Sequence, residues 1–350
     1  MSLSQKLRTP YLIFLGDVPD KVYAKTALGL AQWAPQHCLA QHRYAGCEVD
    51  AGLPDMSLVQ AAQSGAKSLL IGSAPVGGAL QENWIPSLLE AIAQGMDIVS
   101  GLHTKLSDNQ TLCAAAKRYQ VRLIDVRVPP SDLPIGTGKT RSGKRLLAVG
   151  TDCAVGKKYT SLALTKALQS AGIPCDFRAT GQTGIMIAGQ GLPIDAVVAD
   201  FIAGAAESLS PDNHPEHWDI IEGQGSLFNP AYAGVSLGLL HGSQPDAIVL
   251  CHDPQREHID SCPHMPIPNV QQCIDANLQM GKLTNPAIQC VGISVNTSQV
   301  PADKRQALLQ QLAQTTGLPC VDPIIDGVQA IVDGLLTQFP TARTQVGGAS

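Results

Sequence analysis

The chain has 350 residues, of which 44% are hydrophobic and 15% are charged, and its formal net charge is −5 at pH 7. This length predicts two domains, each large enough to bury its own core. The composition argues against two classes of partner. No basic block is present to bind nucleic acid, and no apolar run is long enough to span a membrane.

The first third of the chain alternates apolar runs with helical patterns, which is typical of a parallel sheet flanked by helices. We predict a Rossmann-like α/β domain over residues 1–128. The expected strands are Tyr11–Gly16, Lys67–Ile71, Asp97–Val99 and Val121–Val126, and the expected helices are Lys21–Trp33, Trp84–Gln94 and Asn109–Tyr119. The loops Gly72–Gly78 and Ser100–His103 follow strands, where open α/β sheets bind ligands. We interpret both loops as plain turns in preference to anion sites.

Ten cysteines are scattered singly along the chain, and no Cys-x-x-Cys pair occurs. Several lie in or beside predicted strands, among them Cys251 and Cys290. Single buried thiols of this kind are typical of a reducing compartment, so we expect a cytoplasmic protein.

A proline-rich stretch interrupts the α/β pattern, and we predict a linker over residues 129–145. It contains Gly136–Thr140, whose sequence Gly-Thr-Gly-Lys-Thr looks like the end of a phosphate-binding loop. Such a loop needs an earlier glycine and a preceding strand. Leu133 stands where the glycine is needed, and no strand comes directly before it. We therefore interpret this segment as an exposed connection without a ligand.

The strongest motif follows the linker. The apolar run Leu146–Gly150 predicts a buried strand, and Ser161–Leu168 has helical periodicity. Between them a glycine-flanked loop ends in Gly-Lys, with five intervening residues instead of the usual four. The unpaired N–H groups of a helix N-terminus attract anions. We predict that this loop binds phosphate through Gly150, Thr151, Cys153, Ala154, Val155, Gly156, Lys157, Lys158 and Tyr159.

After this loop the α/β pattern resumes. We predict a P-loop NTPase-like parallel-sheet domain over residues 146–340 and a flexible tail over residues 341–350. Lys158 stands where a P-loop normally has a Ser or Thr whose hydroxyl binds Mg²⁺. A second cation at this position favours holding a phosphate group over transferring one.

The long spacing of Gly150–Lys157 resembles the dethiobiotin synthetase branch of P-loop proteins. In that fold a Glu-Gly-x-Gly strand end faces the loop and its carboxylate helps to hold Mg²⁺; Glu222 matches this position. A closer resemblance, to the D-glutamate N-acetyltransferase (DgcN-like) family, covers nearly the whole chain. It rests on four motifs in order and two further segments, which are Gly150–Lys157, Ala179–Gly184, Asp200–Glu207 and Glu222–Leu227, with Gly101–His103 and Pro230–His241.

This resemblance implies transfer of an acetyl group from acetyl-CoA to the amine of D-glutamate or a similar amino acid. A P-loop without its Mg²⁺ hydroxyl suits the reaction, because CoA carries a pyrophosphate and a ribose phosphate that lysines can bind. The amine must lose a proton, and the candidate bases are Asp152, Asp200 and Glu222. Arg178 is a candidate ligand for the substrate carboxylate. We expect no resident metal, and we expect a homo-oligomer.

Three other interpretations stay open. A kinase or ligase that uses ATP or GTP with Mg²⁺ would keep the chemistry of the parent fold, with Asp152 and Glu222 near the metal and Thr151 or Thr160 beside them. A non-catalytic nucleotide sensor would bind its ligand without turnover. A zinc site is less favoured than a polar active-site loop in the segment that contains His252, Asp253, His258, Asp260, Cys262 and His264.

Overall fold

The structure is a computed structural model that describes residues 6–340, so the tail predicted over residues 341–350 lies outside the described residues. The chain divides into two compact units. The first contains the residues up to Pro130 together with Gly181–Ala196, and the second contains Ser131–Thr180 and the residues from Val197 onward.

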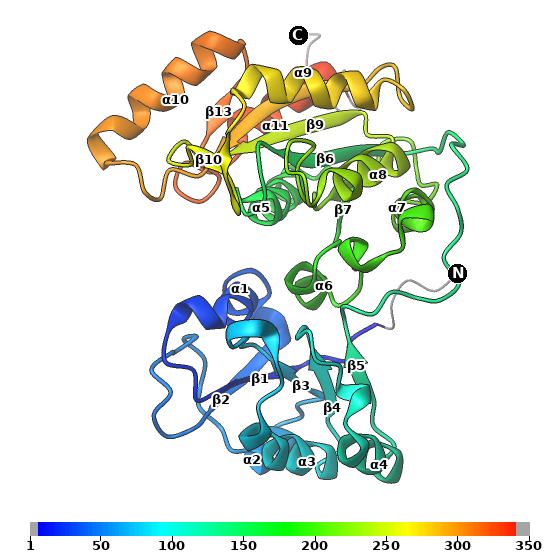
Figure 1. The fold of residues 1–350 in the computed structure, drawn as a ribbon, viewed down its shortest axis with the longest axis vertical. Coiled ribbons are helices and arrows are strands. Elements are labelled where there is room, and N and C mark those ends of the chain that lie inside the picture. Colours follow the sequence, from blue (N-terminus) through cyan, green and yellow to red (C-terminus); the bar gives the residue numbers. More distant parts are fainter. Residues whose placement is uncertain (1–5, 341–350) are drawn as a thin grey trace. The chain divides into compact units, whose positions relative to one another are not determined.

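The first unit is a parallel sheet in the order β2-β1-β3-β4-β5, with helices on both faces (Figure 1). The strands are β1 (Tyr11–Gly16), β2 (Cys38–Arg43), β3 (Ser68–Ile71), β4 (Asp97–Ser100) and β5 (Leu123–Asp125), and the helices are α1 (Lys25–Trp33), α2 (Leu58–Gln63), α3 (Ile85–Ala93) and α4 (Gln110–Tyr119). Helices α2, α3 and α4 lie along one face and α1 lies on the other (Figure 1). The predicted α/β architecture of this part of the chain is confirmed.

Strand β2 is absent from the prediction because it is a polar edge strand. Its apolar part, Cys38–Ala40, is short, and the fully buried residue that follows is the polar Gln41, so no apolar run marks the strand. The Gln41 amide donates to Asp50 at 2.9 Å and accepts from the backbone N–H of Ala51 at 2.9 Å. These bonds satisfy the buried amide, and they depend on a loop that only the folded chain brings close.

Helix α6 (Gln182–Ala188) belongs to the first unit, although it lies within the range predicted for the P-loop domain. It packs against α1, where the hydroxyls of Thr26 and Thr183 are 3.0 Å apart. The backbone N–H of Leu7 donates to the carbonyl oxygen of Gly189 at 2.8 Å. The chain therefore returns to the first unit after the second has begun, which a division at the linker does not anticipate.

The second unit is a parallel sheet in the order β13-β12-β9-β6-β8-β7. Its strands are β6 (Lys144–Gly150), β7 (Cys175–Arg178), β8 (Trp218–Ile221), β9 (Ala247–His252), β12 (Gln289–Val295) and β13 (Cys320–Val321), and its helices are α5 (Lys157–Ser170), α7 (Ile202–Leu209), α8 (Ala233–Ser243), α9 (Val270–Gly281), α10 (Ala302–Thr316) and α11 (Gln329–Gln338). Helices α5 and α11 pack together against the sheet, and their apolar side chains share one core with the strands. Helices α8 and α9 also contact the sheet, and α7 packs on α8 (Figure 1).

A short antiparallel hairpin, β10 (His258–Ile259) and β11 (Cys262–Pro266), lies between β9 and α9. Ser261 turns the hairpin with a left-handed φ of +62°. The hairpin forms a separate two-stranded sheet and is not part of the parallel sheet.

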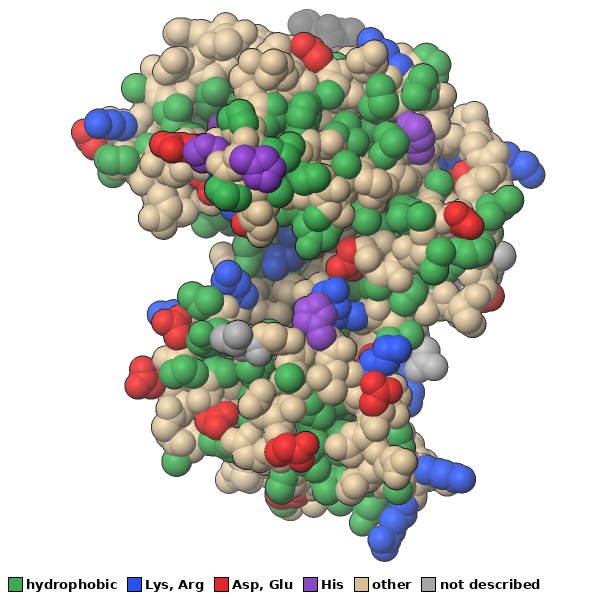
Figure 2. All heavy atoms as spheres, viewed as in Figure 1, with side chains coloured by type: hydrophobic (Ala, Val, Ile, Leu, Met, Phe, Trp, Pro, Cys, Tyr) green, Lys and Arg blue, Asp and Glu red, His purple; other side chains and the backbone are tan. Residues whose placement is uncertain are grey.

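The sequence argues against a membrane span and against a basic patch that binds nucleic acid. Between residues 6 and 340, no helix combines the length and hydrophobicity needed to cross a bilayer. On the face drawn in Figure 2, basic and acidic side chains are interspersed. All ten cysteines fall within the described range and are free thiols, as the sequence predicts.

Candidate functional site

The predicted phosphate-binding loop joins β6 to α5 at the carboxyl edge of the second sheet. The loop reverses direction through two residues with left-handed backbone, Ala154 (φ +55°) and Gly156 (φ +105°). No side chain caps the N-terminus of α5. The helix therefore presents its first N–H groups and the positive end of its dipole toward the loop, where an anion is stabilised.

Lys157 is enclosed by this loop. Its side chain is buried, and its ammonium donates to the carbonyl oxygen of Asp152 at 2.8 Å, its one hydrogen-bond partner among residues 6–340. Burial lowers the pKa of Lys157 below its ordinary value. A buried ammonium that has a carbonyl but no carboxylate as partner gains stability from a bound anion.

Gly223 allows the neighbouring strand end to reach this lysine. A Cβ at Gly223 would overlap the carbonyl oxygen of Ala148 on β6 and would lie 3.0 Å from Cδ of Lys157. The preceding residue is Glu222, which is 4% exposed. Its Oε2 accepts the backbone N–H of Thr180 at 2.9 Å. The predicted Glu-Gly-x-Gly strand end therefore lies beside the P-loop lysine.

Whether this loop can bind Mg²⁺ depends on Lys158 and on two nearby threonines. The Lys158 ammonium lies 4.5 Å from the centre of the Tyr159 ring. The Thr160 hydroxyl donates to a backbone oxygen one helical turn earlier at 3.1 Å, and the Thr151 hydroxyl is 3.2 Å from a ring nitrogen of His252. Both hydroxyls are thus engaged within the protein. These residues do not fit the usual P-loop Mg²⁺ ligand set.

Asp152 is at the centre of a buried hydrogen-bond network. Its Oδ1 accepts from the Asn229 amide at 2.9 Å, and its Oδ2 accepts from Nη1 of Arg256 at 2.8 Å and from the backbone N–H of Asp260 at 2.6 Å. Burial opposes ionisation, but the donors outweigh it and hold the pKa of Asp152 below its usual value. The carboxylate connects three segments of the chain and is a poor proton acceptor at neutral pH.

Arg178 is directed away from the P-loop. Its Nε donates to Asp219 at 2.7 Å, and its Nη2 lies 3.3 Å from a carboxylate oxygen of Asp176. Asp176 and Asp219 are paired near the starts of β7 and β8, at the level of Arg145 on β6, whereas the loop begins at the opposite end of that strand. The contacts of Arg178 are therefore those of a structural ion pair.

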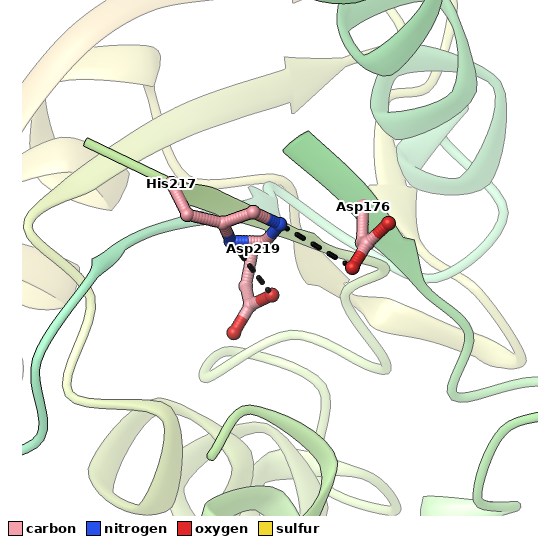
Figure 3. Close-up of side chains that lie close together, drawn as sticks. All are labelled: Asp176, His217 and Asp219. Atoms are coloured by element: carbon pink, nitrogen blue, oxygen red, sulfur yellow. Dashed lines mark ion pairs between the residues drawn. The ribbon is translucent and has the colours of Figure 1, made fainter. Parts of the chain in front are cut away.

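These two carboxylates and His217 form a group whose ligand atoms lie within 4.8 Å of one another, and no other such group was found in residues 6–340 (Figure 3). The His217 Nε2 lies 3.3 Å from the Asp176 carboxylate. Arg178 already supplies a positive charge to both carboxylates, which is the role that a cation would have. The group therefore has its counter-charge within the protein.

Asp200, the remaining candidate base, is exposed just before α7. No hydrogen bond or ion pair of its side chain was found within the described range. The structure brings Asp152, Glu222 and Lys157 together at the P-loop. The backbone of Arg178 accepts the N–H of Glu222 at 3.0 Å, but among residues 6–340 the side chains of Asp200 and Arg178 form no hydrogen bond or ion pair with this group.

The Gly-Thr-Gly-Lys-Thr segment is bound by a carboxylate of the protein itself. Glu207 on α7 accepts the backbone N–H groups of Thr137 and Gly138, each at 2.8 Å. An internal carboxylate thus satisfies the groups that a phosphate would need. This agrees with the interpretation that the segment has no ligand.

Three side chains near the P-loop were not predicted as site residues: Thr180, Asn229 and Arg256. They lie on separate connections; Thr180 belongs to the motif Ala179–Gly184, whereas no local motif marks Arg256. The segment of Arg256 is rich in histidines, of which His258 and His264 are exposed on the β10–β11 hairpin (Figure 2). Among the described residues, these histidines and Cys262 do not come together as a group of three ligands.

Comparison with known proteins places this geometry in context. Residues 134–332 match the family described as "Domain of unknown function (DUF1611_C) P-loop domain", and residues 42–129 match "Domain of unknown function (DUF1611_N) Rossmann-like domain". The chain is 51% identical over 330 residues to a D-glutamate N-acetyltransferase of Pseudoalteromonas, covering 94% of this chain and 99% of the relative. It is 47% identical to a D-glutamate N-acetyltransferase of Tritonibacter scottomollicae, with the same coverage. A crystal structure of a DUF1611 family protein from Anabaena variabilis is similar, with a TM-score of 0.81 and 31% identity over 94% of this chain and 100% of that one.

Proposed function

Because the chain belongs to the DUF1611 family, whose two curated relatives above are named for one reaction, we propose that it transfers the acetyl group of acetyl-CoA to the amino group of D-glutamate. In this proposal the P-loop holds phosphate groups of CoA. The names of the relatives support the acceptor and the reaction. The donor and the role of the loop are supported by the physical chemistry of the site.

The observation that carries the role of the loop is the buried Lys157 ammonium, which has only a carbonyl oxygen as its partner within residues 6–340. A phosphate placed against this ammonium and the first N–H groups of α5 would receive charge-assisted hydrogen bonds. Lys158 adds a second cation where a kinase needs a Mg²⁺ ligand. The loop is thus better suited to hold a carrier than to transfer its phosphate.

The acyl transfer itself needs a free amine and a positioned thioester. A base removes one proton from the ammonium of D-glutamate, and the nitrogen then attacks the thioester carbonyl carbon. The C–N bond forms and the C–S bond breaks. The nitrogen then loses its second proton, which the departing CoA thiolate takes up.

Glu222 is the candidate base that we favour, because it lies beside Lys157 through Gly223. The oxygens of Asp152 already accept three donors, and Asp200 is exposed outside this cluster. The use of Arg178 for the substrate carboxylate stays a prediction that its contacts do not favour. The expected homo-oligomer also stays a prediction.

Thermal stabilisation by acetyl-CoA, compared with ATP and Mg²⁺, tests the proposal. At a ligand concentration of 100 Kd, binding to the native state adds about 2.7 kcal/mol of stability, which is a shift of several degrees. Lys157→Ala should abolish the shift caused by acetyl-CoA. The matched control is Lys166→Ala, because Lys166 lies on the same helix and is exposed.

Turnover is measured as release of free CoA thiol with D-glutamate as acceptor. Wild-type protein and Lys166→Ala should release thiol at equal rates, and Glu222→Gln should lower kcat by about 10²- to 10⁴-fold if the carboxylate is the base. If ATP with Mg²⁺ stabilises the protein and acetyl-CoA does not, the kinase or ligase interpretation replaces this one.

A further inference from the structure

We infer that Arg256, on the connection from β9 to the β10–β11 hairpin, is a second ligand of the carrier's diphosphate and acts across the P-loop from Lys157. This inference rests on the proposed function, because it concerns the same phosphate site. It gives a binding role to a residue that no sequence motif marks.

Arg256 and Lys157 hold consecutive carbonyl groups of the P-loop. Nζ of Lys157 donates to the carbonyl oxygen of Asp152, and Nη1 of Arg256 donates to that of Cys153, each at 2.8 Å. Both cations also act electrostatically on the Cys153 thiol. Two positive groups from different elements therefore converge on one turn of backbone.

The guanidinium of Arg256 is only partly used by the protein. It has five N–H donors. Nη1 divides its two between the Cys153 carbonyl and the Asp152 carboxylate, and Nε and Nη2 have no partner among residues 6–340. The side chain is 23% exposed, so ligand can reach this edge. The Nε–Nη2 edge is the planar fork that binds two oxygens of a phosphate.

Two other arginines of this chain use the full fork to bind an aspartate. Arg8 binds Asp97 through Nε and Nη2, and Arg43 binds Asp55 through the same two atoms. In each case the fork faces the carboxylate, which is the stronger geometry for an ion pair. Arg256 instead presents a single nitrogen to its aspartate and leaves its fork open beside the phosphate-binding loop.

The P-loop turn is surrounded by both acidic and basic side chains. Asp152 and Asp260 act on Cys153 with the opposite sign to Lys157 and Arg256, and the formal charges of these four groups cancel. Asp152 is fully buried and saturated by donors, and Asp260 is exposed to water. The dipole of α5 and the charge of Lys158 then leave the loop with a net attraction for an anion.

A series of three acetyl donors tests the inference with the full-length protein. Acetyl-CoA has the diphosphate and the ribose 3′-phosphate, dephospho-acetyl-CoA has the diphosphate alone, and S-acetyl-pantetheine has neither. For Arg256→Ala we expect the KM of the first two donors to rise by roughly 10- to 100-fold, since a charge-assisted contact is lost. The kinetics with S-acetyl-pantetheine and the KM of D-glutamate should not change.

Two further variants separate binding from a structural effect. Gln255→Ala changes the adjacent exposed side chain and should match the wild-type protein with all three donors. Arg256→Lys keeps the charge but loses the fork, so it should recover only part of the affinity.

The possible results have distinct meanings. If Arg256→Ala lowers kcat equally with all three donors, the residue only holds the loop and the inference is wrong. It is also wrong if the penalty disappears with dephospho-acetyl-CoA, or if the KM of D-glutamate rises instead. If the wild-type protein uses none of the donors, the proposed function itself fails; if it uses them and Arg256→Ala is unchanged, only this inference fails.

Discussion

Removal of the Asp152 carboxylate should destabilise the second unit strongly, because this one group connects the P-loop to two other segments. In Asp152→Ala, the Arg256 guanidinium, the Asn229 amide and the backbone N–H of Asp260 would lose their acceptor. Breaking one partner of a buried ion pair costs about 3–5 kcal/mol. Arg256 is 23% exposed and can turn toward water, so we expect about 2–4 kcal/mol.

The pH dependence gives an independent check. The pKa of Asp152 is lower in the folded protein than its ordinary value of 3.8. The group therefore contributes stability that is present above pH 3.8 and is lost as the pH falls below it through the folded pKa. Asp152→Asn should remove this part of the acid destabilisation and should be less stable than wild type at pH 7.

Differential scanning calorimetry at pH 7 and at several acidic pH values measures both effects. A loss of 2–4 kcal/mol corresponds to a decrease of about 4–16 °C in the melting temperature of a domain of this size. Asp200→Ala is the matched control, because Asp200 is an exposed carboxylate, and it should melt like the wild-type protein. The reasoning is refuted if Asp152→Ala melts within one degree of the wild-type protein, or if Asp152→Asn keeps the full acid sensitivity.

Three further changes have defined outcomes. Gly223→Ala should prevent normal folding of the second unit, because its Cβ would overlap the Ala148 carbonyl oxygen; a cooperative melt at the wild-type temperature would contradict this. Arg141→Met should lower the free energy of unfolding in urea by about 3 kcal/mol or more, because Arg141 donates to the carbonyl oxygens of Ser210 and Gly242 at the ends of α7 and α8. A loss below 1 kcal/mol would exclude this capping role. Dialysis against a chelator should leave the melting temperature unchanged, because Arg178 already pairs with Asp176 and Asp219; a decrease that Zn²⁺ restores would show that the group holds a metal.

Much of the fold could be predicted because its signals are local. Most of the buried parallel strands are short apolar runs, and the helices that were predicted have their own periodicity. The P-loop is equally local: strand, turn and helix start follow one another between Leu146 and Leu168. The identity of Lys158 alone was enough to weaken the expectation of Mg²⁺ chemistry. These features depend on neighbours in sequence, so no tertiary contact is needed to recognise them.

The local signals failed where a structure depends on contacts between distant residues. Strand β2 has a buried glutamine in place of an apolar run, and its bonds to the loop at Asp50 are formed only on folding. Helix α6 has no sequence feature that assigns it to the first unit; it is held there by residues such as Thr26, 157 positions away.

The sequence by itself determined that a P-loop turn follows the first strand of the second sheet, and it supplied the candidate carboxylates. Only the tertiary structure decided where each of them lies and which donors surround it. Arg256 meets Asp152 across 104 residues, whereas Arg178 turns to Asp219 on the neighbouring strand. The direction of a charged side chain is set by the nearest opposite charge or carbonyl oxygen in the folded chain. That neighbour can be distant in the sequence, so the adjacent residues do not reveal it.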